Sequence, residues 1–285
     1  MKQLIVNADD LGADQARNAG IFEAINAGIV TSVSLIANAS ATNDAIGRLL
    51  SIERRIISIG LHFNISEGAP LSKGLKRLIA ANGNFLGKKT AHQLLSRSGD
   101  AELEDEIREE FSAQASVLLN AGITLDHMDG HQHVHVFPGA LRVMLEETKN
   151  RGIPWFRIPL EPANPSWMLQ PDLLQETNTF NKYAEYALTH TRSCGLRVTD
   201  HFRGLYYKGN LPADKWPGFL ADIPEGLTEL MVHPGRAEVN PTGNPFSGFS
   251  TAERELELHA LIDGRFRSAL LAAEIELVSF PGTVI

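Results

Sequence analysis

The fold is decided by residues 4–37, LIVNADDLGADQARNAGIFEAINAGIVTSVSLIA. The apolar run Leu4-Ile5-Val6 predicts a buried strand, and residues 14–27 place apolar side chains at helical spacing. Gly28 predicts the end of that helix, and residues 31–37 indicate a second strand. Because strand, helix and strand in this order are typical of a parallel βαβ unit, the N-terminal region favours the α/β class.

The same alternation continues along the chain. Further helices are predicted over residues 41–52, 102–121, 140–150 and 253–272, and further strands over residues 56–61, 123–128, 155–158, 228–232 and 275–280. Segments rich in Gly, Lys, Pro or Asn interrupt the pattern and are predicted to be insertions over one face, at residues 66–98, 161–188 and 236–248. No repeat, low-complexity tract or linker separates two cores, so we expect one domain over residues 1–285.

Composition excludes several classes of protein. Of the 285 residues 43% are hydrophobic and 21% charged, which is typical of a folded globular chain. The net charge is −8 and there is no block of Lys or Arg, so a nucleic-acid partner is not expected. No apolar stretch approaches the length of a membrane span or of a signal-peptide core, and we expect a cytoplasmic protein without a membrane partner. The single cysteine, Cys194, indicates a reducing compartment and neither a disulfide nor a thiolate metal site.

Unusual polar residues follow the predicted strands directly. They are Asp9 and Asp10, His62, Asp129 with His131, Arg157, and His233. In parallel α/β barrels the active site lies at the carboxyl ends of the strands, where the loops converge. Five strands that each end on such a group therefore predict an active site at one end of a barrel.

Two of these stretches have a chemistry of their own. The adjacent carboxylates of Asp9 and Asp10 point to different sides of a strand, so one can bind a metal while the other handles protons. In His131-Gln132-His133-Val134-His135 the histidines are two residues apart, which in extended structure would place all three on one face. Imidazole suits Zn²⁺ and similar cations, and carboxylate oxygens extend the choice to Mg²⁺ or Mn²⁺.

Structural interpretations of the same residues stay open. Either aspartate can be a helix N-cap, and the histidines of residues 131–135 can face solvent. His62 and His233 can be core histidines, His127 and His135 can serve packing, and Arg157 can pair with an acid or position a carboxylate such as Asp9. No Gly-x-Ser-x-Gly elbow and no phosphate-binding glycine pattern is present, which argues against the common serine hydrolases and nucleotide sites.

Four ordered motifs, supported by two shorter ones, carry a resemblance to a known family. The motifs are residues 5–12 (IVNADDLG), 60–62 (GLH), 129–135 (DGHQHVH) and 232–235 (VHPG), with 157–159 (RIP) and 200–202 (DHF) in addition. Together they resemble the YdjC-like carbohydrate deacetylases, which include chitooligosaccharide and hopanoid-biosynthesis deacetylases, over residues 4 to about 280. The chain departs from the family at Leu11 and Gly130, where Phe and Ser are more frequent.

The resemblance implies a fold and a set of site residues. The expected fold is a single distorted (β/α) barrel of the TIM-barrel-like, deacetylase type. One divalent metal ion, Mg²⁺ or Zn²⁺, would be held by Asp10, His62 and His131, and Asp9 would be the base. Gly130 and Leu11 are not ligands, so their departure bears on the fit of the substrate rather than on the mechanism.

The expected reaction is removal of an N-acetyl group from a sugar or glycoconjugate. The metal would polarise the acetamide carbonyl and lower the pKa of a water, Asp9 would take its proton, and His233 would protonate the leaving amine. We expect Arg157 to assist catalysis, with His135 the next candidate acid. Substrate contacts are expected from His135, Asp129 and Phe63, with stacking from Phe63, Trp167, Tyr206 and Tyr207; a homodimer is the assembly left open.

Two other classes of function stay open at this stage. A metal-dependent phosphoesterase or a glycosidase can use the same barrel, since a fold does not fix a function. Glycosidases normally use paired carboxylates without a metal, so metal removal distinguishes them. A catalytically silent sugar-binding protein would keep its ligand and release no acetate even with metal supplied.

Overall fold

The computed structural model describes residues 1–52, 57–162, 171–206, 212–238, 245–246, 248 and 250–281. The strands are β1 (Lys2–Leu11), β2 (Ser32–Leu35), β3 (Ser58–Phe63), β4 (His127–Gly130), β5 (Trp155–Phe156), β6 (His201–Arg203), β7 (Gly226–Val232) and β8 (Ile275–Leu277). The helices are α1 (Gln15–Asn26), α2 (Thr42–Leu50), α3 (Lys88–Leu95), α4 (Ala101–Asn120), α5 (Pro138–Asn150), α6 (Pro171–Ser193), α7 (Trp216–Ala221), α8 (Ala252–Ile262) and α9 (Gly264–Ala272), with a 3-10 helix η1 (His131–Val136).

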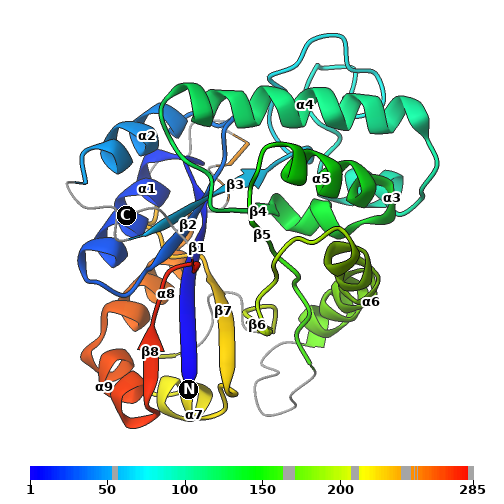
Figure 1. Cartoon of the computed structure of the whole chain (residues 1–285). Coiled ribbons are helices and arrows are strands. Elements are labelled where there is room, and N and C mark those ends of the chain that lie inside the picture. The colour runs from blue at the N-terminus through cyan, green and yellow to red at the C-terminus, as the bar shows by residue number, and fades with distance from the viewer. Residues whose placement is uncertain are drawn as a thin grey trace.

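All strand pairings are parallel, and the strands form one sheet around which the helices are arranged (Figure 1). The order is β5-β4-β3-β2-β1-β7-β6, and β8 pairs with the first residues of β1. A single bridge between Trp155 and Arg197 joins β5 to the segment that leads into β6, so the two ends of the sheet meet there. The architecture is a distorted α/β barrel of the expected class.

The interior of the barrel has an apolar layer and a polar layer. Ile5, Trp155, Leu227 and Phe280 form a small buried cluster. Since β1 and β5 are not neighbours in the sheet, their side chains meet across the interior. Nearer the carboxyl ends of the strands the interior holds ionisable groups, among them Arg157, which is buried. The large apolar core lies between the sheet and the helices and includes Leu4, Val6 and Ala8 of β1.

Helix α1 begins and ends where elementary chemistry predicts. Asp14 is its N-cap, and its carboxylate accepts a hydrogen bond from the backbone N–H of Arg17 at 2.7 Å. The helix ends at Asn26, and Gly28 then takes a φ of 68°, which glycine adopts readily. In the pairing of β1 with β2 the register shifts between Ala8 and Leu11. This bulge redirects the two residues that it contains, Asp9 and Asp10.

Most of the predicted elements are confirmed with small changes of length, but the strand predicted over residues 123–128 is observed as β4, at His127–Gly130. The first strand is longer than expected and includes Asp9 and Asp10, whereas β5 is limited to Trp155–Phe156. The predicted third strand starts later, at Ser58, because β3 spans Ser58–Phe63; Ile56 lies outside the described residues.

Three expectations about local structure were wrong. The histidine stretch is the 3-10 helix η1 and not extended, because Gln132 and His133 take φ values of 53° and 59°. The helix predicted over residues 253–272 is interrupted at Asp263, whose extended backbone caps α9. The segment 161–188, predicted as an insertion, contains most of the long helix α6, which packs against η1 and α5. Among the described residues, no helix combines the length and apolarity needed to cross a bilayer.

Candidate metal centre and active-site pocket

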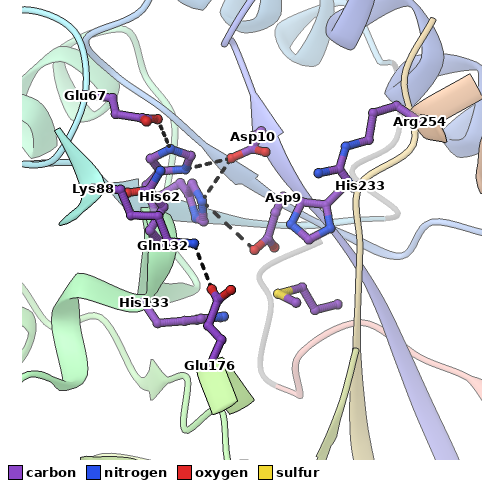
Figure 2. Close-up of a pocket in the computed structure, with 12 residues that line it drawn as sticks. Asp9, Asp10, His62, Glu67, Lys88, Gln132, His133, Glu176, His233 and Arg254 are labelled. Atoms are coloured by element: carbon purple, nitrogen blue, oxygen red, sulfur yellow. Dashed lines mark hydrogen bonds and ion pairs between the residues drawn. The ribbon is translucent and has the colours of Figure 1, made fainter. Parts of the chain in front are cut away.

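A pocket of about 230 Å³ opens at the carboxyl ends of β1, β3 and β7 and beside η1, which follows β4. The residues that line it are Asp9, Asp10, His62, Glu67, Lys88, His131, Gln132, His133, Glu176, Met231, His233 and Arg254 (Figure 2). The sequence-predicted residues Asp9, Asp10, His62, His131 and His233 are thus brought together in one place.

Asp10, His62 and His131 converge in this pocket from three different segments. Asp10 Oδ1 lies 3.3 Å from His62 Nε2 and 2.9 Å from His131 Nδ1. All three side chains are buried, and each offers a ligand atom within 4.8 Å of the others. Ligands about 2.0–2.2 Å from one ion lie at such mutual distances. Two imidazoles and a carboxylate, with pocket space beside them, therefore fit a divalent cation of the zinc or magnesium type.

Each of the two histidines is held on its outer nitrogen by a carboxylate. His62 Nδ1 donates to Asp129 Oδ1 at 2.7 Å, and His131 Nε2 lies 3.0 Å from Glu67 Oε2. Asp129 in turn accepts a hydrogen bond from the Ser34 hydroxyl at 2.5 Å. Such carboxylate partners fix the ring orientation of metal-binding histidines and raise their basicity. The inner nitrogens are thereby directed toward Asp10.

The electrostatics of this cluster favour positive charge. Burial lowers the pKa of His62, but the carboxylates of Asp129 and Asp9 outweigh burial and raise the pKa to about 10. Burial likewise opposes charge on Asp10, yet His131 and His62 hold the pKa of Asp10 well below 3.8. The pKa of His131 is raised because Asp10 outweighs burial. A divalent cation would supply the positive charge that the neighbouring carboxylates favour. Its binding would displace protons from the imidazoles of His62 and His131.

A second group of side chains, Asp9, His62 and Asp129, also places one ligand atom of each residue within 4.8 Å of the others. Its carboxylates already have a cation between them. Arg157 donates through Nη1 and Nη2 to the two oxygens of Asp9, both at 2.7 Å, and Arg157 Nη2 lies 2.9 Å from Asp129 Oδ2. Because the guanidinium is fully buried and takes the place of an ion here, we favour the group that contains Asp10.

Asp9 and Arg157 belong to a larger buried network. Asp9 Oδ1 also accepts a hydrogen bond from Asn7 Nδ2 at 2.7 Å. On its other side Arg157 contacts Glu229 of β7 at 2.8 Å. Burial lowers the pKa of Arg157, but the charges of Asp129 and Asp9 outweigh burial and raise the pKa well above its ordinary value. The guanidinium is therefore permanently charged, and it fixes the carboxylate of Asp9 in both rotation and position.

The backbone is strained where the site is built. In the described residues four non-glycine residues have positive φ, namely Asp10, Gln132, His133 and Glu274. Three of these line the pocket. Asp10 has a φ of 66°, which costs on the order of 1–3 kcal/mol and is typical of functional sites. The left-handed turn at Asp10, within the bulge of β1, lets adjacent aspartates take different directions.

His233 stands across the pocket from His62, next to Asp9 (Figure 2). Two side chains hold the backbone of His233: Arg17 Nη1 donates to its carbonyl at 2.9 Å, and its own N–H donates to Glu257 Oε2 at 3.1 Å. Arg17 comes from α1 and Glu257 from α8. The loop that follows β7 is therefore anchored to two helices.

Four residues expected at the site do not line the pocket. Arg157 and Asp129 lie behind Asp9 and His62, and Phe63 is fully buried with its ring 5.4 Å from that of Phe111. His135 is also fully buried, and its Nε2 donates to the carbonyl of Arg157 at 3.1 Å. Burial lowers the pKa of His135 to about 3, so its ring is neutral. The turn of η1 directs His135 into the wall of the barrel, away from His131.

Sequence reasoning missed Glu67, Lys88, Glu176 and Arg254, which line the same pocket. Glu67 and Lys88 belong to the segment predicted as an insertion, and Lys88 pairs with Glu176 of α6 at 2.8 Å. Of the aromatic residues expected to stack on sugar, Tyr206 is buried, while Trp167 and Tyr207 lie outside the described residues. The one available signal was the position of Glu67 shortly after His62.

The amino-acid sequence is similar to a defined family and to several proteins named carbohydrate deacetylase. A sequence profile of the family described as YdjC-like protein matches residues 3–272. The carbohydrate deacetylase of Homo sapiens is 37% identical, over 96% of this chain and 89% of the human protein. That of Mus musculus is 38% identical, over 96% and 93%. A carbohydrate deacetylase of Brevibacillus brevis is 27% identical, over 98% of both chains.

The fold is also similar to a solved structure. A crystal structure from Enterococcus faecalis V583, described as a candidate cellobiose-phosphate cleavage protein, superimposes with a TM-score of 0.77. The two chains are 21% identical, and the superposition covers 100% of this chain and 99% of the other. At this level of identity the likeness supports the fold alone.

Proposed function

The chain belongs to the YdjC-like protein family, and on that basis we propose that it is a metal-dependent hydrolase that removes N-acetyl groups from an acetylated sugar or glycoconjugate. The relatives named carbohydrate deacetylase support the reaction class. The observation that carries the proposal is the pair of neighbouring sites in one pocket. Asp10, His62 and His131 offer a ligand set, and both carboxyl oxygens of Asp9 beside them accept hydrogen bonds from Arg157.

One divalent cation, Mg²⁺ or Zn²⁺, completes the proposed site. When bound by Asp10, His62 and His131, it would polarise the acetamide carbonyl and lower the pKa of a water. Three protein ligands leave positions open for the substrate and this water.

Asp9 is the proposed base. Its Oδ1 accepts two hydrogen bonds, from Arg157 and Asn7, whereas Oδ2 accepts one from Arg157. Oδ2 lies 4.0 Å from His62 Nε2 and so faces the proposed metal ligands. A carboxylate oxygen has two acceptor positions, so Oδ2 retains one for the proton of the attacking water. Arg157 prevents the carboxylate from rotating while it accepts that proton.

His233 is the proposed acid for the leaving amine. It directly follows β7, whereas the two histidine ligands belong to β3 and η1. Figure 2 shows His233 across the pocket from His62. The amine that leaves a sugar is a poor leaving group unless it gains a proton as the C–N bond breaks. Arg17 and Glu257 hold the backbone of His233, and His233 lines the pocket beside Asp9.

The experiment is a screen for acetate release. The chelated protein, reconstituted in parallel with Mg²⁺ or Zn²⁺, is incubated with N-acetylated monosaccharides and oligosaccharides. We expect stoichiometric acetate and free amine from at least one substrate, only with metal. Release of reducing sugar or phosphate instead of acetate would favour a glycosidase or phosphoesterase. Binding of sugar with no product at any metal would favour a silent sugar-binding protein.

A further inference from the structure

Arg254 is a pocket residue to which the proposed reaction gives no role. It lies in the first turn of α8, after the end of the segment of residues 239–249. Figure 2 shows its side chain lying beside His233, with the guanidinium turned toward the space between His233 and Asp10. Its side chain is only 16% exposed. A largely buried cation at the wall of a reaction pocket needs a physical explanation.

The hydrogen bonding of this guanidinium is incomplete. Nη1 of Arg254 is buried and has no hydrogen-bond partner among the described residues. The carboxylate that it pairs with, Glu257 Oε2, is 3.8 Å from Nη1, which is beyond hydrogen-bond distance. Glu257 Oε2 accepts its hydrogen bond from the backbone of His233 instead. Arg254, a residue of the pocket wall, thus has a guanidinium nitrogen without an acceptor in the part of the chain that the structure describes.

The charge of Arg254 is also weakly compensated. Within the described part of the chain Arg254 has one ion-pair partner, Glu257, and burial raises the pKa of Glu257 to about 7. A second guanidinium is near: the pKa of Arg17 is lowered to about 10, by burial and then by the charge of Arg254. An anion bound at Arg254 would relieve this repulsion and supply the missing acceptor.

We propose that Arg254 and the adjoining wall beside His233 form a subsite for the carboxylate of the acetate that the reaction releases. The inference rests on the proposed function, which breaks the C–N bond and turns a neutral acetamide into acetate and an amine. A guanidinium binds a carboxylate through two parallel hydrogen bonds, which a neutral acetamide cannot offer. Arg254 is therefore a product-binding residue, and its contact strengthens only after cleavage.

The test is direct titration of acetate into protein loaded with Zn²⁺, followed by calorimetry or ¹H NMR line broadening. Arg254→Met should weaken acetate binding by about ten-fold or more, the usual effect of losing a charge-assisted pair, with unchanged zinc content. Arg254→Lys keeps the charge and loses the fork, so an intermediate affinity is expected. The matched control is Arg267→Gln, at an exposed arginine of α9. Circular dichroism verifies that each variant is folded.

Acetate binding is measured without turnover, so its result does not depend on whether the proposed deacetylase reaction is correct. Equal acetate affinity in wild-type protein and in both Arg254 variants would overturn the subsite. Binding of inorganic phosphate at Arg254 in clear preference to acetate would also overturn it, because the subsite would then serve a phosphate group of the substrate. Absence of acetate release from every N-acetylated sugar, with Arg254-dependent acetate binding intact, would count against the proposed function alone.

Discussion

Asp9 and Asp10 are adjacent in the sequence, yet their carboxylates have different partners. Asp9 is bound by Arg157 and Asn7, and Asp10 is bound by His62 and His131. The positive φ of Asp10 makes the side chains of Asp9 and Asp10 point in different directions. The division of roles that two neighbouring carboxylates suggested in the sequence thus has a geometric basis, and the roles themselves stay predictions.

Asn substitutions distinguish the two aspartates. Asp10→Asn removes a charged ligand and should lower metal affinity by about ten-fold or more. Asp9→Asn should retain the metal and lower kcat by about 10²–10⁴-fold, because an amide oxygen cannot take the proton. Metal analysis and acetate release on the same samples measure both effects. Equal metal loss in the two variants would show that the roles are shared.

His233→Ala should lower kcat by about 10²–10⁴-fold with metal content nearly unchanged, since it removes the acid and no ligand. The control is the leaving group. An acetyl ester of a good leaving alcohol needs little protonation, so its hydrolysis should fall much less than that of an acetamide. If both substrates slow equally, or if the metal is lost, His233 is a ligand or a structural residue.

Single residues were predictable where a strand ended on them and not elsewhere. Asp9, Asp10, His62, His131 and His233 each follow a predicted strand, and all five line the pocket. Glu67 and Arg254 reach the pocket from a loop after β3 and from the start of α8, positions that no strand pattern marks. Apart from the position of Glu67 shortly after His62, their sequence context is that of surface residues, so the three-dimensional structure was needed to place them at the site.

At the level of elements, the contact between α1 and the loop after β7 positions His233. A Cβ atom at Gly20 would lie 2.4 Å from Cα of Gly235, which is backbone that cannot rotate away. Glycine at this position of α1 is therefore required by the close approach of the loop.

Gly20→Ala should lower the free energy of unfolding by about 1–3 kcal/mol and reduce kcat, because the helix pushes the His233 loop away. Gly47→Ala in α2 is the matched control. Nothing lies within 4 Å of a Cβ there, so alanine should raise stability by about 0.5–1 kcal/mol with unchanged activity. Denaturant unfolding of both variants measures the difference. Equal stability of the two variants would contradict the close contact.

Glu161 ties the segment after β5 to the segment after β6. It is buried, and its Oε2 accepts hydrogen bonds from the backbone N–H groups of Gly204 and Leu205 at 3.1 and 2.6 Å. Burial raises the pKa of Glu161 from 4.5 to about 7. Between these two pH values the folded chain keeps a proton that the unfolded chain has lost, so stability falls as the pH rises.

Glu161→Gln removes this titration. At about 1.4 kcal/mol per pKa unit, the wild type should lose about 3 kcal/mol relative to the variant between pH 4.5 and pH 7. Urea unfolding at a series of pH values measures it, with the exposed Glu253→Gln as a control that should keep the wild-type slope. If the unfolding free energy of Glu161→Gln has the same slope against pH as that of the wild type, Glu161 does not titrate between pH 4.5 and pH 7.

Helices and strands with a clear period were predictable, whereas η1 was not. Histidines at alternate positions are compatible with an extended chain. Nothing in the amino-acid sequence indicates the left-handed backbone of Gln132 and His133. That backbone is imposed by the packing around it, including the hydrogen bond between His92 Nε2 and the carbonyl of Gln132 at 3.0 Å. Tertiary contacts of this kind decided the local structure.

For the whole molecule, the barrel brings residues far apart in the sequence into one interior. Asp9, Arg157 and Glu229 are separated by more than 70 residues at each step, yet they form one buried network. The alternation of helices and strands predicted the α/β class, which is confirmed. The two-residue β5 and the three-residue β6 are too short to give a period, so the meeting of the sheet ends at Trp155 and Arg197 was not predictable. One domain over residues 1–285 stays a prediction.

The most direct test of the central claim is the metal content of the histidine variants. Wild-type protein, His62→Ala and His131→Ala are loaded with Zn²⁺ or Mg²⁺, dialysed and analysed by mass spectrometry of the metal, with the exposed His259→Ala as a control. We predict one ion per chain in the wild type and the control. The two variants should lose most of the metal and also lose acetate release, while circular dichroism shows that they stay folded. Full occupancy in either His62→Ala or His131→Ala would contradict the proposed metal centre.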